Sequence, residues 1–470
     1  ILKENGDEVS NDEYKIQANR ILSKTYNKQY NEKLRNWQGL LSNNRSISFA
    51  NDGFQLKFMF IPLSSGGDNR EKDWIELNAY AYSEPIMCFS DTDMSHASTN
   101  QLLGLSQYGP LDCSYINDSR LQRPIQLALF SPKEHLSKII KHLKKLNNSF
   151  KTNGKDKFLQ DYDGFEKIYR RKLLIPSDED PVLCITYPTK ATEQLTIQDF
   201  AAFIKRGIDR SATNALNFDV MVIYIPASFA RFREAPDSLD DYNLHDAIKL
   251  YAADKGISVQ FIEERSTTAY DICKVLWGLS TSLYAKSQGA LWHPKSISDN
   301  TAYIGIGYAR SENQGICIGC SQLFDSTGTG IRMILKKIKN PRYFQKTNPY
   351  MDRNEAREMM IELRESYYHC CPAAKLNRVV IHKTTPFMKE EIIGITQAFE
   401  GVDVELLQIQ EYSPWRAIRF GMQAQKQADN YAVKRGTVIP ITRNSFLIWT
   451  HGSLMIPEWT GHGNYFKGGR

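Results

Sequence analysis

Four polar side chains between residues 245 and 286 could bind one anion together. His245 and Lys249 stand four residues apart on an expected helix, so their side chains project from the same face. Gln260 lies in the next expected strand, and Lys286 lies near the end of the helix that follows. Two lysines supply charge, Gln260 an amide donor and His245 a ring that donates to phosphate or stacks on a base. Taken singly, each is also an ordinary surface residue.

The elements that must position these side chains alternate between strand and helix. Strands are expected at 182–187, 219–226 and 258–262, and helices at 197–207, 244–253 and 269–287. Such alternation is typical of a parallel α/β sheet covered by helices. Ligands of these sheets bind at the carboxyl ends of the strands and at adjoining helix ends, where the four residues could converge.

The order of elements changes after residue 299. Three consecutive strands are expected at 301–309, 316–324 and 330–336, followed by a helix at 354–368 and a strand at 378–382. This order predicts a ribonuclease-H-like fold. The turn 327–330 joins two antiparallel strands, so we interpret it as a hairpin rather than a phosphate loop.

The first 180 residues give weaker signals. A charged helix is expected at 11–43, with strands at 47–62, 74–82 and 85–89. The stretch 133–146 has the period of an amphipathic helix, and 150–181 has the composition of a linker. The apolar face of the helix expected at 133–146 consists of Leu136, Ile139, Ile140 and Leu143. The opposite face is a lysine stripe that is either solvated or directed at phosphates: Lys138, Lys141, Lys144 and Lys145.

Composition restricts the class of protein. The 470 residues exceed one ordinary core, and the net charge of +6 with a pI near 8.7 suits a polyanionic partner without requiring one. No apolar run is long enough for a membrane span, and the first ten residues are too charged for a signal peptide, so we expect a cytoplasmic protein. The chain begins at Ile1 rather than methionine, as a piece of a longer protein would.

The eight cysteines do not form a disulfide framework. Cys317 and Cys320, with the run 369–371 downstream, offer one alternative, a zinc site. Because 315–324 alternates like a buried strand, we favour the interpretation of these cysteines as small apolar residues.

An ordered set of short motifs resembles a known family, the prokaryotic Argonautes. The segments 245–249, 259–261, 264–267 and 283–286, with Trp292, are similar to the MID domain of these proteins, and the histidine at 245 resembles the short Argonautes. The segments 303–309, 379–383 and 435–437 resemble the PIWI domain that follows, so the resemblance spans about residues 183 to 452. It implies that His245, Lys249, Gln260 and Lys286 hold the 5′ phosphate of a guide. Members of this family often add a divalent cation such as Mg²⁺ there, completed by the chain's own C-terminal carboxylate, a ligand that cannot be placed in this sequence.

Two positions argue against cleavage. A nuclease of the ribonuclease-H fold holds two metal ions with several carboxylates. In this family the first carboxylate ends the first strand, and the second carboxylate follows a His-Arg pair. Here Gly307 and Thr384 stand at those two positions. Glu390 and Glu391 are nearby acids that we expect on an exposed helix surface. The catalytic residues are therefore expected to be absent.

The resemblance implies a multi-domain α/β chain: an APAZ-like or linker region at 1–82, a short-Argonaute N-terminal segment and linker at 83–180, a Rossmann-like MID domain at 181–295 and a PIWI domain at 296–470 that lacks its C-terminal part. We expect a guide RNA to direct recognition of invading single-stranded DNA. An APAZ-containing effector, sirtuin-like or TIR-type and NAD-consuming, would then be activated, with oligomerisation as one route. Along the duplex we expect backbone contacts from Lys336, Lys337, Lys339 and Arg342.

Two alternatives stay open at this point. One is an active guided endonuclease whose metal ligands lie at other positions. The other is an α/β sensor in which His245 and Lys249 bind a small molecule.

Overall fold

The chain forms two compact units, residues 1–84 with 414–470 and residues 85–413. A computed structural model describes residues 46–48, 55–57, 78–90, 95–114, 123–153, 159–187, 195–213, 217–233, 243–267, 271–295, 300–311, 316–326, 330–339, 342–344, 348–373, 375–410 and 433–450. The expected helix at 11–43, most of the expected strands at 47–62 and 74–82, and the turn 327–329 lie outside these residues.

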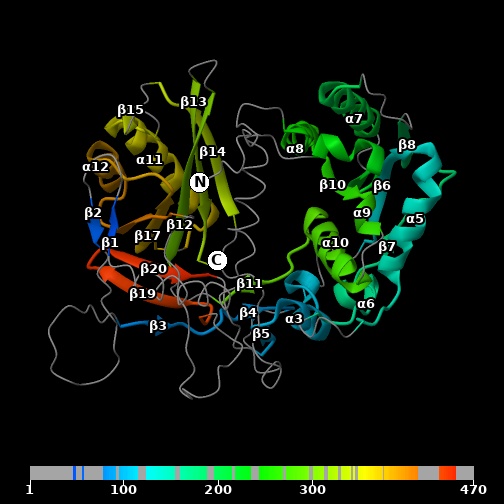
Figure 1. The fold of residues 1–470 in the computed structure, drawn as a ribbon, viewed down its shortest axis with the longest axis horizontal. Helices are drawn as coiled ribbons and strands as arrows, with labels where there is room; N and C mark the ends of the chain where they lie inside the picture. The colour runs from blue at the N-terminus through cyan, green and yellow to red at the C-terminus, as the bar shows by residue number, and fades with distance from the viewer. Residues whose placement is uncertain are drawn as a thin grey trace. The chain divides into compact units, whose positions relative to one another are not determined.

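A parallel sheet of five strands is the framework of residues 123–295 (Figure 1). Its order is β10-β9-β6-β7, and β8 also pairs with β6. The strands are β6 (Ile125–Pro132), β7 (Leu173–Leu174), β8 (Cys184–Tyr187), β9 (Val220–Ile225) and β10 (Ser258–Glu263). Every residue of β9 is buried, as expected for a strand covered on both faces. The predicted parallel α/β sheet is confirmed.

Helices cover both faces of this sheet. One apolar cluster contains Val220, Val222 and Tyr224 of β9 and lies under the helices α3 (Gln101–Tyr108), α5 (Leu136–Lys144), α6 (Phe165–Tyr169) and α10 (Ile272–Lys286). The alternate residues Met221, Ile223 and Ile225 pack with α7 (Ile197–Ala212) and α8 (Leu244–Asp254). The two-residue period of a strand therefore divides the interior into two cores.

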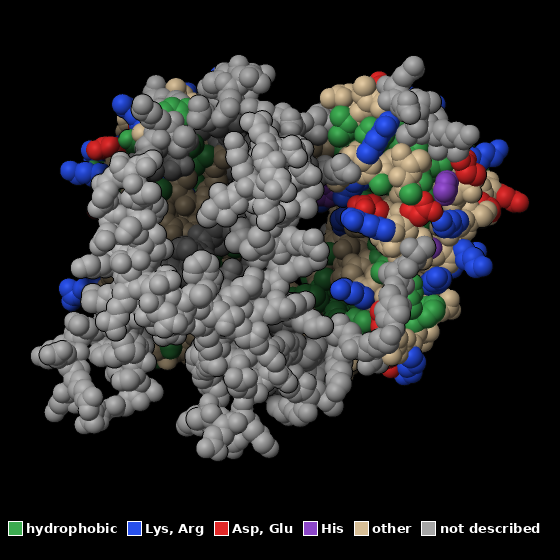
Figure 2. Space-filling view, in the orientation of Figure 1, with side chains coloured by type: hydrophobic (Ala, Val, Ile, Leu, Met, Phe, Trp, Pro, Cys, Tyr) green, Lys and Arg blue, Asp and Glu red, His purple; other side chains and the backbone are tan. Residues whose placement is uncertain are grey.

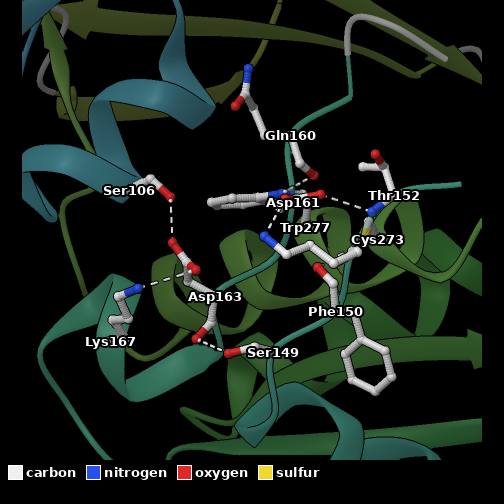
Figure 3. A network of polar contacts seen from close by, with 11 residues as sticks. Ser106, Ser149, Phe150, Thr152, Gln160, Asp161, Asp163, Lys167, Cys273 and Trp277 are labelled. Carbon is white, nitrogen blue, oxygen red and sulfur yellow. Dashed lines mark hydrogen bonds and ion pairs between the residues drawn. The ribbon is translucent and has the colours of Figure 1, made fainter. Parts of the chain in front are cut away.

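The predicted boundary at residue 181 falls inside this sheet, because β6 precedes it and pairs both with β7, which also precedes it, and with β8 and β9, which follow it. The expected linker 150–180 instead packs into the core, where Tyr162, Phe165 and Tyr169 are fully buried. Figure 3 shows the polar contacts that fasten it. Trp277 Nε1 donates to the carbonyl of Gln160 (3.1 Å), and Cys273 Sγ to that of Phe150 (3.4 Å).

Local sequence explains where the site-bearing helices begin. Asn243 caps α8 by accepting a hydrogen bond from the amide of Asp246 (3.2 Å), and Asp271 caps α10 by accepting from Cys273 (3.0 Å). In α7, Thr196 and Asp199 form a reciprocal capping box. Each cap satisfies amides that a helix start leaves without partners.

A second, mixed sheet of order β14-β13-β12-β17-β18 follows, and all of its strands except β18 were predicted. It consists of β12 (Thr301–Ser311), β13 (Ile316–Phe324), β14 (Gly330–Lys337), β17 (Arg378–Lys383) and β18 (Asp403–Gln408). The first three strands are antiparallel, whereas β17 and β18 run parallel to β12. The helices α11 (Arg353–Cys370) and α12 (Lys389–Ala398) pack on its apolar cluster. The ribonuclease-H-like order of elements is thus observed.

The remaining described elements are short. They are β1 (Ser46–Ser48) with β2 (Gln55–Lys57), β4 (Met87–Cys88) with β5 (Ala97–Ser98) and β11 (His293–Pro294), β15 (Arg342–Phe344) with β16 (Asn348–Tyr350), and the helix α9 (Glu264–Thr267). No described helix combines the length and the apolar composition of a membrane span.

In the smaller unit, β3 (Tyr80–Ala81) joins the hairpin of β19 (Thr437–Thr442) and β20 (Ser445–Trp449) in one antiparallel sheet. An ion pair between Arg435 and the buried Glu84 connects the same two segments. Residues from the expected N-terminal region and from the end of the expected PIWI domain therefore share a unit.

Candidate functional site

Lys286 and Gln260 are in direct contact at the edge of the parallel sheet. The Lys286 ammonium, at the end of α10, donates to Gln260 Oε1 and to the carbonyl of Val259, both at 2.6 Å. This carbonyl is accessible because β10 is an edge strand of its sheet. The Gln260 amide nitrogen donates in turn to the carbonyl of Phe261 (2.8 Å). The structure therefore brings two of the four predicted residues together.

Lys249 completes a pair of positive charges. It is exposed on α8, and its charge, together with burial, lowers the pKa of Lys286 to about 8. Burial is the larger cause, because a half-buried ammonium loses hydration. Within the described part of the chain, no carboxylate forms an ion pair with Lys249 or Lys286. Two neighbouring ammonium groups without a counter-charge favour an anionic ligand.

His245 lies one helical turn from Lys249, against the ring of Phe261, with 5.4 Å between ring centroids. Its Nδ1 is 3.0 Å from Asp246 Oδ1. The guanidinium of Arg233 lies over the same Phe261 ring, 5.0 Å from its centroid. His245 thus shares a face of α8 with Lys249, and in the described part of the chain its ring contacts Asp246 and Phe261 rather than Lys286.

Arg233 is a residue that the sequence reasoning missed. It ends a 3₁₀ segment, Ala227–Arg233, and lies 3.4 Å from Glu263, which also pairs with Arg265 (2.7 Å). The run Arg231-Phe232-Arg233, with basic residues on both sides of an aromatic one, was the only sequence signal available.

Asp112 fixes the end of α10, although it lies far away in the sequence. Its carboxylate accepts hydrogen bonds from the Tyr284 hydroxyl (2.6 Å) and from the amide of Ala290 (2.7 Å). A Cβ on Gly289 would lie 2.3 Å from the Tyr284 ring, so glycine is needed where the chain passes that ring. These contacts bracket Lys286 on both sides and set its position.

Gly307 lies on β12 and Thr384 directly follows β17, so the two residues lie near one another in the mixed sheet. The parallel partners Ile306 and Lys383 directly precede them on β12 and β17. Gly307 is exposed, and a Cβ there would meet no atom within 4 Å. Thr384 is exposed as well, and its carbonyl accepts from Gln408 (3.4 Å). The sheet thus brings the two predicted positions together without a carboxylate on either.

Glu391 is not on an exposed surface, so that expectation was wrong, whereas Glu390 is exposed as predicted. Glu391 and Lys383 form a buried ion pair at 2.5 Å, and each side chain is 1 % exposed. Glu391 also accepts from the Tyr308 hydroxyl (2.6 Å) and from the amide of Met351 (3.1 Å). Glu391 lies on the inner face of α12, and the ion pair with Lys383 stabilises its charge there. The sequence pattern did not reveal this pairing.

The expected backbone-binding residues lie on and after β14. Lys336 pairs with Glu362 (2.6 Å), while Lys337 and Arg342 are exposed. On α5, the predicted apolar face is buried, and Lys138 pairs with Glu264. Figure 2 shows basic side chains interspersed with acidic ones over the described residues of that face of the molecule. The basic side chains seen there do not form a continuous stripe.

The described residues contain no cluster of three or more side chains suited to a metal ion. Cys370 is exposed and Cys371 half-buried, and both have free thiols. Near Lys286 the side chains are cationic or amide groups, which do not fit Mg²⁺ because this ion requires several oxygen ligands. The ion expected there depends on a carboxylate outside the described residues, and it stays a prediction.

A groove of about 530 Å³ lies elsewhere, between the end of α11 and the turn before β18. Its lining is mixed in charge: Arg364, Glu365, Tyr368, His369, Glu400 and Val402. It contains none of the predicted site residues.

No protein-family model and no curated protein matches the chain. Solved structures with a similar fold include the Argonaute of Aquifex aeolicus, with a TM-score of 0.47 and 14% identity over 79% of this chain and 45% of that one. They also include the Argonaute of Marinitoga piezophila in complex with a 5′-OH guide RNA, with a TM-score of 0.47 and 13% identity over 80% of this chain and 50% of that one. Drosophila Piwi is similar with a TM-score of 0.45 and 11% identity over 79% of this chain and 42% of that one. The chain spans half or less of the length of each of these proteins.

Proposed function

We propose that the chain binds the phosphorylated 5′ end of a guide nucleic acid at His245, Lys249, Gln260 and Lys286. The observation that carries this proposal is the pair of ammonium groups, one of them half-buried, that lacks a carboxylate partner among the described residues. A terminal phosphate has almost two negative charges near neutral pH, so it would relieve the repulsion between Lys249 and Lys286. His245 would donate to this phosphate or stack on the first base.

Binding of a 5′-phosphorylated RNA to the variant Lys249→Ala/Lys286→Ala tests this proposal. Charged hydrogen bonds are worth about 1.5–3 kcal/mol each, so the loss of two should lower the affinity by at least about 100-fold, with a shallower salt dependence. Lys274→Ala is the matched control, since Lys274 is exposed on the same helix. An affinity for this RNA that the double substitution leaves unchanged would exclude the site.

We further propose that the guide directs recognition of single-stranded DNA without cleavage. Gly307 and Thr384 support this, since neither side chain offers the carboxylate that a two-metal centre needs. Guide-loaded protein incubated with labelled complementary DNA and Mn²⁺ should leave the DNA intact. Cuts at one position opposite the guide would instead establish the alternative of an active endonuclease.

The output of recognition is proposed to come from an APAZ-containing effector that consumes NAD, as the sequence resemblance implies. Lys336, Lys337 and Arg342 would contact the guide–target backbone, although the ion pair of Lys336 with Glu362 leaves it less available than the other two. A cytoplasmic setting and oligomerisation on activation belong to the same proposal. The combined addition of guide and target to the full native assembly should lower NAD, whereas guide alone should not.

A further inference from the structure

One face of the three-stranded sheet in the smaller unit is apolar and open to solvent (Figure 1). Tyr80 of β3 lies opposite Val438 of β19, which lies opposite Ile448 of β20. Directly paired residues of an antiparallel sheet share a face, as do residues two apart along a strand, so Tyr82 and Phe446 lie on this face as well. The two tyrosines, Phe446 and Ile448 are between 52 % and 69 % exposed.

The opposite face of the same sheet is less exposed, with Ile439, Leu447 and Trp449 half-buried on it. An antiparallel sheet with one face in water normally has polar side chains on that face. Here the exposed large apolar side chains that the structure describes in this unit all lie on the solvent face. A contiguous patch of this kind indicates an interaction surface.

The rings on this face stand on paired backbone rather than on a loop. Tyr82 extends the pairing of β3 by donating its amide hydrogen to the carbonyl of Gly436 (3.1 Å). Beside it, Arg435 Nε donates to Oε2 of the buried Glu84 (2.7 Å), which connects β3 to the start of β19. The aromatic side chains are therefore held in place before a ligand arrives, which lowers the entropy that binding costs.

Positive charge lies at both ends of β19. Lys434 is half-buried before the strand, and Arg443 is exposed in the turn that follows it. Neither forms an ion pair with a described residue, and the one acid among the described residues of this unit, Glu84, is paired with Arg435. The surroundings of the aromatic face thus attract anions.

We propose that this face is a second nucleic-acid contact of the chain, a platform on which the bases of a single strand stack. Aromatic rings accept any base, because every base has a π-face, and the cations at the two ends of β19 attract the phosphates on either side of the stacked bases. An apolar protein partner would match the rings but would leave these cations without counter-charge. The contact does not depend on a 5′ phosphate, so it is independent of Lys249 and Lys286.

Binding of a labelled 5′-hydroxyl oligothymidine of about 12 nucleotides to the full chain tests the platform. The variant Tyr82→Leu/Phe446→Leu keeps apolar side chains and removes two rings, so its affinity should fall roughly 30-fold or more, since each stacked base contributes at least about a fivefold factor. Tyr82→Phe/Phe446→Tyr keeps both rings and should bind within about threefold of wild type. Arg443→Gln should lower the slope of log affinity against log salt by about 0.7, the value for one phosphate contact.

Two control variants separate this contact from other surfaces. Tyr368→Ala removes an exposed tyrosine of α11 in the larger unit and should leave the affinity unchanged. Lys249→Ala/Lys286→Ala should also bind this probe like the wild type, so a failure of the platform is distinguishable from a failure of the phosphate site.

Wild-type affinity in the leucine variant would overturn the proposal. So would an equal loss in the leucine variant and in the variant that keeps both rings, because stacking would then not be what binds the strand. If the leucine variant bound the probe normally but lost self-association in sedimentation, the face would instead belong to an interface with a second copy of the chain.

Discussion

His142 is a buried residue of α5 whose ring has no hydrogen-bond partner on either nitrogen among the described residues. It is 3 % exposed, and burial, followed by the charge of Lys145, lowers its pKa to about 4. The folded state therefore excludes a proton that the unfolded chain accepts near pH 6.5. Its contribution to stability is complete above pH 6.5 and is lost as the pH falls to about 4.

We expect this residue alone to reduce the free energy of unfolding by about 3 kcal/mol between those pH values, since one pKa unit corresponds to about 1.4 kcal/mol. The variant His142→Leu removes the titrating ring and keeps an apolar side chain of similar size. Urea unfolding of the two proteins at both pH values measures the difference. Parallel loss of stability in wild type and variant would show that His142 does not titrate in this range.

The buried pair Lys383–Glu391 leads to a second prediction at the residue scale. Removing one partner leaves a buried charge, so Glu391→Leu should lower the free energy of unfolding by about 3–5 kcal/mol. Adding Lys383→Met should recover most of this loss, because no unpaired charge remains. A double variant as unstable as the single one would show that the packing of Tyr308 and Met351 around Glu391 dominates instead.

At the scale of secondary-structure elements, the helix α10 positions the Lys286 ammonium group, and Asp112 fixes the end of that helix. Asp112→Ala should lower both stability, by roughly 2–4 kcal/mol, and guide affinity, although Asp112 contacts neither Lys286 nor Lys249 in the structure. Tyr284→Phe removes only one of the two hydrogen bonds and should have a smaller effect on both measurements. If Asp112→Ala bound 5′-phosphorylated RNA like the wild type, the position of Lys286 would not depend on this contact.

The elements that carry the site could be predicted closely. The bounds predicted for α8, β10 and β13 lie within one residue of those observed, because their apolar periods are uninterrupted. The strand β6 was missed because only Ser131 and Pro132 separate its apolar run from the amphipathic helix that follows. The stretch 150–180 has the composition of a linker, yet its residues Tyr162 and Tyr169 pack in a core that also contains Trp277 and Tyr284, more than a hundred residues further along the chain.

The candidate site could be predicted only in part. The spacing of His245 and Lys249 placed them on one helical face, and Gln260 and Lys286 are in contact as their positions suggested. The direction of the Gln260 amide, the place of Arg233 against Phe261 and the role of Asp112 depend on contacts between distant segments, which no local pattern contains.

For the molecule as a whole, the proposals describe a protein that retains the means to hold a guide and lacks the carboxylates to cut a target. The two features lie on different sheets, β10 with its helices for Lys286 and β12 with β17 for Gly307 and Thr384. Gly307→Ala should therefore leave guide affinity unchanged, because a Cβ there meets open space. A large loss of affinity in Gly307→Ala would show that this edge takes part in guide binding.

The most direct test of guide binding is the identity of the nucleic acids that the protein carries when it is purified from its native cells. Sequencing with and without prior 5′ phosphorylation should recover short strands, expected to be RNA, that already have a 5′ phosphate and that the variant Lys249→Ala/Lys286→Ala no longer retains. Absence of bound nucleic acid, or random fragments retained equally by both proteins, would contradict the account.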